Sequence, residues 1–179
     1  MKLNVEDLQE RELDLSFEVP PETFPSLEEI SAEGSCRFID PVLISLHARR
    51  VREMIVVDGR FQTRVRFMCS RCLAEFEDAL SGDFTLTYTR RSAPAEPPSE
   101  LELEVEEIGI VPFEGNEIDL RDGIQEEIVM SIPMQPHCSE DCRGLCPQCG
   151  ADLNLRSCGC QTVKGHPKFA VLKGLKLKK

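Results

Sequence analysis

Alternation of hydrophobic and polar residues dominates the first half of the chain and predicts β-strands. Residues 12–19, 42–48 and 83–89 each place apolar side chains on one face and polar side chains on the other. Asp58-Gly59 is typical of a two-residue hairpin turn, which requires positive φ. The Pro-rich residues 20–30 predict a turn, and residues 101–105 a further short strand. The positions expected to face the core are Leu13, Leu15, Phe17, Val19, Val42, Ile44, Leu46, Ala48, Phe61, Thr63, Val65, Phe67, Phe84, Leu86 and Tyr88.

The pattern changes between residues 117 and 133, where it predicts the one main helix. Apolar residues recur every four positions on a single stripe, as in a helix that packs on a sheet. Asp119 is suited to cap the first free amides, and Pro133 ends the helix. The stripe consists of Leu120, Ile124, Ile128 and Ile132.

These elements together predict an α+β fold in three parts. A β-rich domain, either an antiparallel sheet or a partial barrel with one main helix, is expected over residues 1–133. A cysteine-rich zinc-knuckle module over residues 134–162 is expected to pack on it. A basic C-terminal tail over residues 163–179 completes the chain.

Cysteine is the residue type that most changes this picture, with nine in the chain. The acidic, alternating N-terminus differs from a signal peptide, and no apolar run approaches the roughly 18 residues of a membrane span. A cytoplasmic location without a membrane partner is therefore expected, where cysteine pairs are typical of metal ligands or redox centres. Cys36 stands alone and is expected to be buried as a small apolar residue.

The six cysteines between residues 138 and 160 predict a structural zinc site. Cys146-Pro-Gln-Cys149-Gly150 has the form of a zinc knuckle, in which both thiolates reach one ion and the glycine permits the turn. One or two Zn²⁺ ions are expected, each in a shell of four thiolates. The predicted ligands are Cys146, Cys149, Cys158 and Cys160 for one ion, and Cys69, Cys72, Cys138 and Cys142 for the other.

Other arrangements of these cysteines stay open from the sequence. The main competitor is a single zinc ion held by four C-terminal cysteines, with His137 able to replace a thiolate. A redox dithiol of Cys69 and Cys72 is another, with Arg71 favouring the thiolate, although such a motif normally starts a helix and strands are predicted here. A four-thiolate iron centre and metal-free buried cysteines are further alternatives. The cysteines of the single-ion arrangement are Cys138, Cys142, Cys146 and Cys149.

Catalysis is not expected from these residues. A full shell of thiolates leaves no position for a reactive water. The sequence contains no HExxH, no GxSxG and no phosphate-binding glycine loop. The chain therefore reads as a non-enzymatic protein with no evident small-molecule substrate.

Charge is distributed unevenly around the net value of −11. Residues 92–152 carry 2 basic and 15 acidic residues, whereas residues 153–179 carry 7 basic residues and no acidic one. Basic segments can therefore bind RNA phosphates, or the tail can pack its apolar side on the domain. With the turn at Asp58-Gly59, Glu53 is expected opposite Arg64, which leaves other arginines freer. The RNA-binding candidates are Arg60, Arg66, Arg71, Lys164, Lys168, Lys173 and Lys176.

A series of motifs runs in order over about residues 36–175. It includes Cys69-Ser-Arg-Cys72-Leu73 with Phe76, then Ile118-Asp119-Leu120, Glu126-Glu127-Ile128 and Ile132-Pro133. It continues with Cys138, Cys142-Arg-Gly-Leu-Cys146-Pro-Gln-Cys149-Gly, Leu153-Asn154, Cys158-Gly-Cys160 and Pro167-Lys-Phe169-Ala-Val-Leu172-Lys173. In these motifs the chain resembles the YceD family, the large ribosomal RNA subunit accumulation proteins.

The resemblance implies a role in accumulation or processing of the large-subunit (23S) rRNA precursor, without a known catalytic activity. The implied partners are this precursor, an assembling ribosomal protein, or both. One alternative is an acidic zinc-ribbon adaptor that binds a basic ribosomal protein. A second alternative is a CxxC thiol redox protein.

Overall fold

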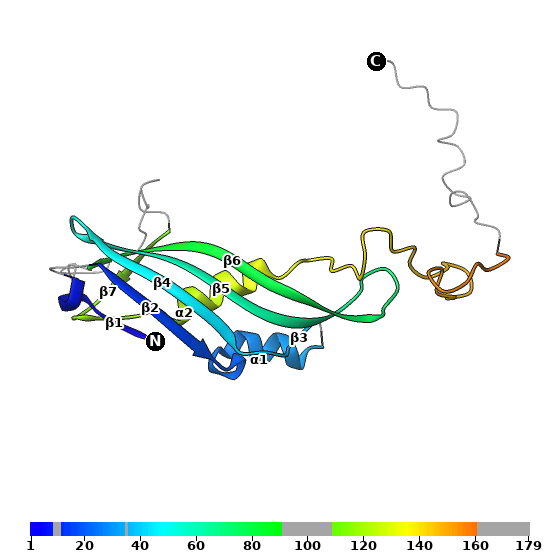
Figure 1. Ribbon diagram of the computed structural model, residues 1–179, viewed down its shortest axis with the longest axis horizontal. Coiled ribbons are helices and arrows are strands. Elements are labelled where there is room, and N and C mark those ends of the chain that lie inside the picture. Colours follow the sequence, from blue (N-terminus) through cyan, green and yellow to red (C-terminus); the bar gives the residue numbers. More distant parts are fainter. Residues whose placement is uncertain (9–11, 35, 91–108, 161–179) are drawn as a thin grey trace, which may run out of the picture.

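The computed structural model describes residues 1–8, 12–34, 36–90 and 109–160, which form a β-rich structure with two α-helices (Figure 1). The strands are β1 (Lys2–Asn4), β2 (Leu13–Val19), β3 (Cys36–Phe38), β4 (Val42–Val51), β5 (Met54–Met68), β6 (Glu75–Arg90), β7 (Ile110–Phe113) and β8 (Glu117–Asp119). The helices are η1 (Val5–Leu8), η2 (Pro21–Thr23), α1 (Pro25–Ala32) and α2 (Arg121–Ser131), where η marks a 3₁₀ turn.

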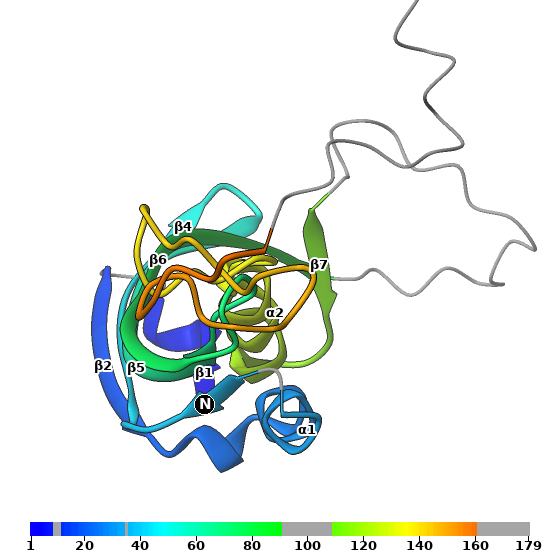
Figure 2. The same cartoon turned by 90° about the vertical axis from the view of Figure 1, so that its right-hand side faces the viewer.

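Strands β4, β5 and β6 form the centre of the main sheet, whose order is β2-β4-β5-β6-β7 with β3 also paired to β5. All of these pairs are antiparallel except β6–β7, which is parallel. Strands β1 and β8 form a separate antiparallel pair. Seen along the long axis, the main sheet curves around α2, and α1 lies beside that helix (Figure 2). The predicted β-rich α+β fold is thus confirmed.

The core lies between the concave face of this sheet and the helices. The alternating residues predicted to face inward on β4, β5 and β6 are buried, and those on β2 are half-buried against the same core. The predicted α2 stripe is also confirmed, with Leu120, Ile124 and Ile128 each 0% exposed and Ile132 packed against the core. Cys36 is buried as predicted. No helix among the described residues has both the length and the apolar character needed to cross a bilayer.

The predicted turn at Asp58-Gly59 is wrong, because both residues lie inside β5. Gly59 pairs with Phe84 of β6, and a Cβ atom on it would come within 2.2 Å of the Phe84 ring. Glycine is therefore required here for the close approach of an aromatic ring to the strand. The actual turn lies between Val51 and Met54, where Arg52 takes a φ of 58°.

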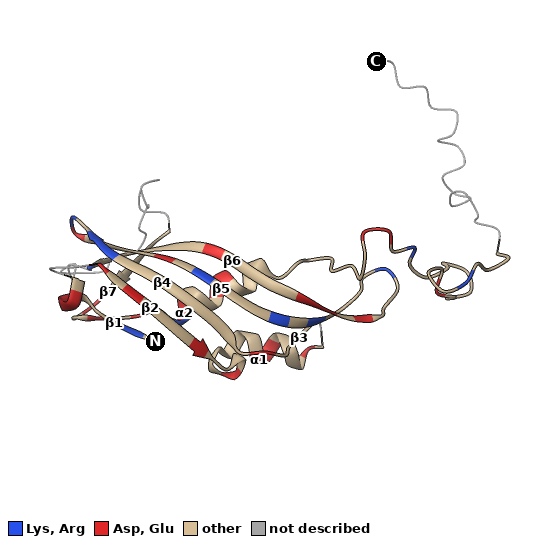
Figure 3. Ribbon diagram, in the orientation of Figure 1, with Lys and Arg blue, Asp and Glu red and all other residues tan. Residues whose placement is uncertain are grey.

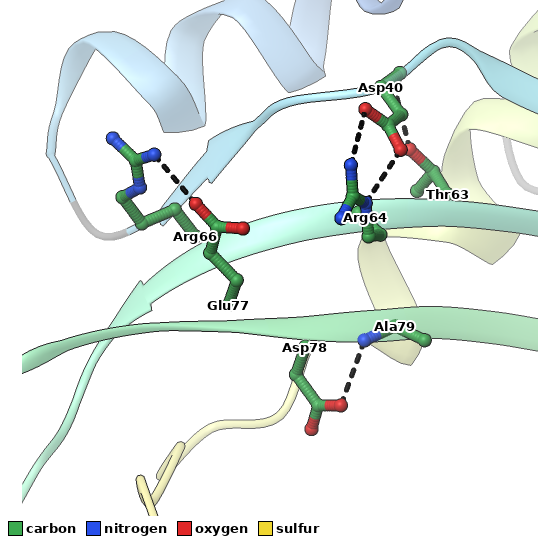
Figure 4. A network of polar contacts seen from close by, with 7 residues as sticks. All are labelled: Asp40, Thr63, Arg64, Arg66, Glu77, Asp78 and Ala79. Carbon is green, nitrogen blue, oxygen red and sulfur yellow. Dashed lines mark hydrogen bonds and ion pairs between the residues drawn. The ribbon is translucent and has the colours of Figure 1, made fainter.

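This shift of the turn also changes the partners of the strand arginines. Arg64 was predicted to pair with Glu53. Instead, its Nε donates a hydrogen bond to the Asp40 carboxylate at 2.7 Å (Figure 4). The hydrogen bond from Arg64 lowers the pKa of Asp40. The correction follows from register, since a turn displaced along the strand brings different residues opposite one another.

The region around the two α-helices differs from the prediction in detail. Residues 20–30, predicted as a turn, contain η2 and most of α1, whose first position is Pro25. Proline is favoured at this position because its missing N–H has no helical partner. At the start of α2 the N-cap residue is Leu120, yet Asp119 accepts a hydrogen bond from the Arg121 amide at 3.0 Å. Asp119 thus caps a free helix amide as predicted, but it lies one residue before the N-cap rather than at the N-cap itself.

Candidate metal centres

Eight cysteines gather in two groups of four. Within each group the sulfur atoms all lie within 4.8 Å of one another, which is close enough for a single metal ion to contact all four. The first group consists of Cys69, Cys72, Cys138 and Cys142, and the second of Cys146, Cys149, Cys158 and Cys160.

The first group joins the end of the long β5–β6 hairpin to the segment that follows α2 (Figure 1). Cys69 is 0% exposed, and Phe76 and Leu145 pack against this group. Ser70 donates from both its amide and its hydroxyl to the carbonyl of Pro136, at 2.8 and 3.0 Å. The hairpin is therefore fixed to the following segment by hydrogen bonds as well as by the cysteines.

The second group is built from a short stretch of chain and is more exposed. Of its cysteines, Cys146 is buried, whereas Cys149 is exposed. An isolated β-bridge joins Leu145 to Asp152, and the Leu145 amide donates to the carbonyl of Arg71 at 3.0 Å. That last bond ties the second group directly to the loop of the first.

Two CxxC loops, residues 69–74 and 146–151, have the same backbone hydrogen bonds. In each, the first cysteine amide donates to the carbonyl five residues later at 2.8 Å, and the amide four residues later donates back at 2.9 Å. The residue after the second cysteine takes positive φ in both loops, 60° at Leu73 and 69° at Gly150. The chain thus contains the same zinc-knuckle turn twice, with a C-x-x-C-x-A sequence each time.

Amide groups in both loops favour the thiolate form of the first cysteine. Burial alone would raise the pKa of Cys69, but hydrogen bonds from the backbone of Cys138, Cys72 and Arg71 lower it to about 5. Hydrogen bonds from the backbone of Cys149 and Gln148 lower the pKa of Cys146 to about 6. Each loop therefore prepares one strong anionic ligand for a cation.

The last cysteine of the second group shows why such a cluster suits a cation. The neighbouring Cys149 sulfur, followed by burial, raises the pKa of Cys160 to about 12. Four thiolates this close repel one another, and a divalent ion removes the repulsion by binding them all.

Sulfur–sulfur distances in the first group match a tetrahedral metal site. The Cys69–Cys142 and Cys72–Cys138 separations are 3.7 and 3.6 Å. Four thiolates about 2.3 Å from one Zn²⁺ lie about 3.8 Å apart along the tetrahedral edges. A disulfide requires about 2.05 Å, so these distances fit metal ligands rather than bonded cysteines.

The arrangement also bears on the alternatives left open by the sequence. Cys138 and Cys142 lie with Cys69 and Cys72, not with the second knuckle, so the single-ion grouping is not formed. His137 belongs to neither group. The Cys69–Cys72 loop connects two strands rather than starting a helix, and each of its sulfurs lies beside a third cysteine. This environment favours a shared ion over an isolated redox dithiol.

The predicted RNA-binding arginines of the sheet are engaged with carboxylates. Arg60 donates from Nε to Asp83 at 2.6 Å, and Arg66 donates to Glu77 at 2.7 Å (Figure 4 shows the second pair). The prediction that these two arginines are the freer ones is therefore wrong. The reason is again register, because each lies directly opposite its acidic partner on β6.

Arg71 has a structural contact that the sequence did not indicate. Its Nη1 donates to the carbonyls of Glu140 and Cys142 at 3.2 and 3.1 Å. The side chain therefore joins the first knuckle to the segment that supplies its other two cysteines. The remaining RNA-binding candidates, Lys164, Lys168, Lys173 and Lys176, lie outside the described residues.

Two further residues support the cysteine groups and were missed from the sequence. Asn154 donates from Nδ2 toward the Cys142 sulfur at 3.5 Å and accepts a bond from the Arg143 amide at 2.8 Å. Gly144 has a φ of 71°, and a Cβ there would lie 3.0 Å from the Arg71 carbonyl oxygen. The repeated C-x-x-C-x-A motif can be found in the sequence and indicates two similar loops. The contacts of Asn154 and Gly144 depend on tertiary structure and have no such signal.

Comparison with known proteins gives a family match that includes these cysteine groups. The family described as "Large ribosomal RNA subunit accumulation protein YceD" matches residues 57–176, a range that contains all eight clustered cysteines. No solved structure matches the chain.

Three relatives illustrate the similarity. "Large ribosomal RNA subunit accumulation protein YCED homolog 1, chloroplastic" of Arabidopsis thaliana is 26% identical over 142 residues, covering 67% of this chain and 44% of that protein. The protein of the same description from Zea mays is 26% identical over 143 residues, covering 68% and 49%. An uncharacterized protein of Mycobacterium leprae is 29% identical over 146 residues, covering 81% and 61%. The chain spans about half the length of the two plant relatives. It belongs to the YceD family of large ribosomal RNA subunit accumulation proteins.

Proposed function

We propose that the protein is a non-enzymatic factor for accumulation of large-subunit rRNA, held together by two structural Zn²⁺ ions. The observation that carries this proposal is the convergence of eight cysteine sulfurs into two groups of four. A four-thiolate shell is closed, so it supports a structural role rather than activation of a water molecule. The family supplies the connection to large-subunit rRNA.

Zinc fits these groups better than other metals. Thiolates are soft ligands, and a tetrahedral set of four is typical of zinc or of iron–sulfur sites. Each knuckle uses two residues between its cysteines, the spacing common in structural zinc sites. The β-rich part (1–133) and the cysteine module (134–162) then form one unit, because the first ion takes ligands from both, and the basic tail (163–179) lies outside the described residues.

The proposed target is the large-subunit (23S) rRNA precursor, contacted mainly from the C-terminal end of the chain. Residues 153–179 carry seven basic residues, among them exposed Arg156, and no acidic residue. Arg143, in the cysteine module (134–162), is exposed as well. Phosphate contacts from such a segment give affinity that falls steeply with salt. The cytoplasm, expected from the sequence, is the proposed location.

Metal analysis of the purified full chain tests the structural half of the proposal. Two zinc ions per chain are expected. One ion would mean that one of the two cysteine groups is not a metal site. No bound metal, with all eight thiols reactive, would overturn the zinc assignment.

Crosslinking in growing cells tests the RNA half. Sites on the large-subunit rRNA precursor should be enriched, and Lys→Gln changes at Lys164, Lys168, Lys173 and Lys176 should reduce them. In binding assays with precursor fragments, the same changes should lower the salt slope by about 3, since each single-strand phosphate contact contributes about 0.7.

The matched control is the double change of Arg60 and Arg66 to Gln, because both arginines are already neutralised by carboxylates. This control should leave crosslinking within about two-fold of the unchanged protein. An equal loss in both variants would mean that the sheet arginines contact the RNA as well as the tail, and would contradict a contact made mainly from the C-terminal end. Recovery of ribosomal protein without rRNA would overturn direct RNA contact.

A further inference from the structure

A shallow groove of about 260 Å³ lies on the helical side of the molecule, away from both cysteine groups. It is lined by Ser26, Gln125, Glu126, Val129 and Met130. The Ser26 amide donates to Gln125 Oε1 at 3.1 Å, which holds α1 and α2 together at this point. The groove is therefore part of the packed fold.

Apolar side chains in and beside this groove are left exposed by the described residues. Met130 in the last turn of α2 is 80% exposed, whereas the preceding residue, Val129, is half-buried. Met134, just beyond the helix, is 93% exposed. Methionine side chains are flexible and polarisable, so they adapt to the apolar side chains of a partner.

One carboxylate lines the groove, and α1 carries two more close to Ser26 in the sequence. Glu126 is the lining residue, and Glu29 lies on the same face of α1 as Ser26, three residues away. The side chains of Glu28, Glu29 and Glu126 make no hydrogen bond or ion pair with other described residues. Helix α1 contains no basic residue, and the single arginine of α2, Arg121, pairs with its neighbour Asp122.

The outer face of the sheet has the opposite character. Four of its arginines on β4 and β5, Arg49, Arg60, Arg64 and Arg66, are each ion-paired with a carboxylate. Figure 3 shows blue segments on these strands and red segments on the neighbouring strand β6. Charge on the sheet is thus largely satisfied within the fold. Charge on the helical side is left for a partner of opposite sign.

We propose that the groove between α1 and α2 binds a lysine- and arginine-rich segment of a protein that carries an apolar side chain. The apolar residue enters between Val129 and Met130, while the basic residues meet Glu29 and Glu126. Complementary charge speeds and orients such an encounter, and apolar contact in the groove slows dissociation. RNA is disfavoured here because its phosphates are repelled by the same carboxylates.

The identity of the bound protein rests on the proposed function, which makes large-subunit ribosomal proteins the natural source of such a segment. The test uses the full chain with the photo-crosslinking residue p-benzoylphenylalanine at Met130, and a matched variant with it at Leu43. Leu43 is a suitable control because it is 49% exposed on β4 of the sheet. The probe is the set of large-subunit ribosomal proteins freed of RNA.

The expected result is crosslinking of a basic protein at position 130, several-fold above position 43, through a segment rich in lysine or arginine. The double change Glu29→Gln and Glu126→Gln should reduce the yield about three-fold or more, in line with the loss of two partly exposed charge pairs. The exposed pair Glu18→Gln and Glu53→Gln, which removes the same charge elsewhere, should leave it unchanged.

Three outcomes would overturn the inference. They are equal yields at positions 130 and 43, a yield that ignores the Glu29 and Glu126 changes, and capture of a second copy of this chain or of its own lysine-rich tail. Failure here is distinguishable from failure of the proposed function, because zinc content and rRNA crosslinking are measured independently of position 130.

Discussion

The first cysteine group links residues that are 66 and 73 positions apart in its two closest sulfur pairs, whereas the second lies between residues 146 and 160. The loop turns are the same in both, as are the amide bonds to the first cysteine. What differs is what each group joins. The first connects the hairpin end to the segment after α2, and the second organises a local stretch of chain.

This difference has an energetic consequence. Closing a loop restricts the unfolded chain by an amount that grows with the logarithm of loop length. The longer closure of the first group therefore gives on the order of 1–2 kcal/mol more stabilisation than the local closure of the second. Burial adds to this difference, because three of the four cysteines are buried in the first group and only Cys146 is buried in the second. We expect the first group to stabilise the whole fold and the second to stabilise mainly itself.

The largest expected effect comes from removing one ligand of each group. Cys69→Ala should release one zinc ion and lower the free energy of unfolding by about 3 kcal/mol or more, because the ion's binding energy is part of the folding energy. Cys149→Ala should also release one ion but change the unfolding of the sheet by about 1 kcal/mol or less. Denaturant unfolding followed by circular dichroism, with zinc analysis, measures both. Equal losses would contradict the comparison.

Metal removal should follow the same order. A chelator is expected to take zinc first from the second group, in which only Cys146 is buried, and later from the first, in which only Cys138 is exposed, giving two kinetic phases. Amide exchange in residues 146–151 should accelerate with the first phase, and exchange in residues 69–74 with the second, although both loops have the same hydrogen bonds. A single phase with simultaneous loss of protection would show that the two groups act as one unit.

Lowering the pH should separate the groups in the same direction. Both first cysteines have a folded pKa below the usual 8.5 or so of a free thiol, so their contribution is fully present above that value and is lost as pH falls. In the metal-free protein this loss should centre near the folded pKa, which is about 6 for Cys146 and about 5 for Cys69, and bound zinc should move both losses to lower pH. Zinc release followed with a metal indicator should therefore begin with the second group. Release of the first group at higher pH would contradict this order.

Much of the fold was predictable because alternation along a strand is a local property. The inward faces of β4, β5 and β6 and the stripe of α2 were identified in this way. Asp58-Gly59 was predicted as a turn because this dipeptide is common in hairpin turns. Here the glycine is needed for close packing against Phe84 on the neighbouring strand, which only the structure shows. Local pattern cannot distinguish a glycine that turns the chain from one that admits a ring.

The candidate site was predictable in its residues but not in its charges. The predicted division of the cysteines is the one that the structure brings together. Local spacing identifies each knuckle, whereas the meeting of Cys138 and Cys142 with the first knuckle is a tertiary contact that left other groupings open. The partners of Arg60, Arg64 and Arg66 depend on strand register, which a displaced turn changes along the whole hairpin. The role of Arg71 depends on a contact with residues far along the chain, and no sequence signal marks it.

A smaller effect is expected where the two groups touch. Gly144→Ala places a Cβ 3.0 Å from the carbonyl oxygen of Arg71, at a φ of 71°. Gly150→Ala is the matched control, since its φ is 69° but nothing lies within 4 Å. Both changes should cost about 1 kcal/mol for the left-handed backbone, and Gly144→Ala about 1 kcal/mol more for the contact. Thermal unfolding and the rate of zinc release measure the difference, and equal costs would mean that the junction adjusts freely.

The smallest effect concerns the positive-φ position of the two loops, which is leucine in the first and glycine in the second. Leu73 has a φ of 60° and is 58% exposed, whereas the equivalent residue of the second knuckle is Gly150. Leu73→Gly relieves about 1 kcal/mol of left-handed strain but adds backbone entropy to the unfolded chain, so the net change in stability should be within about 0.5 kcal/mol. Zinc content should stay the same. A loss of several kcal/mol in denaturant unfolding would show that Leu73 packs as part of the first group, and the two knuckles would then differ in their own structure as well as in what they join.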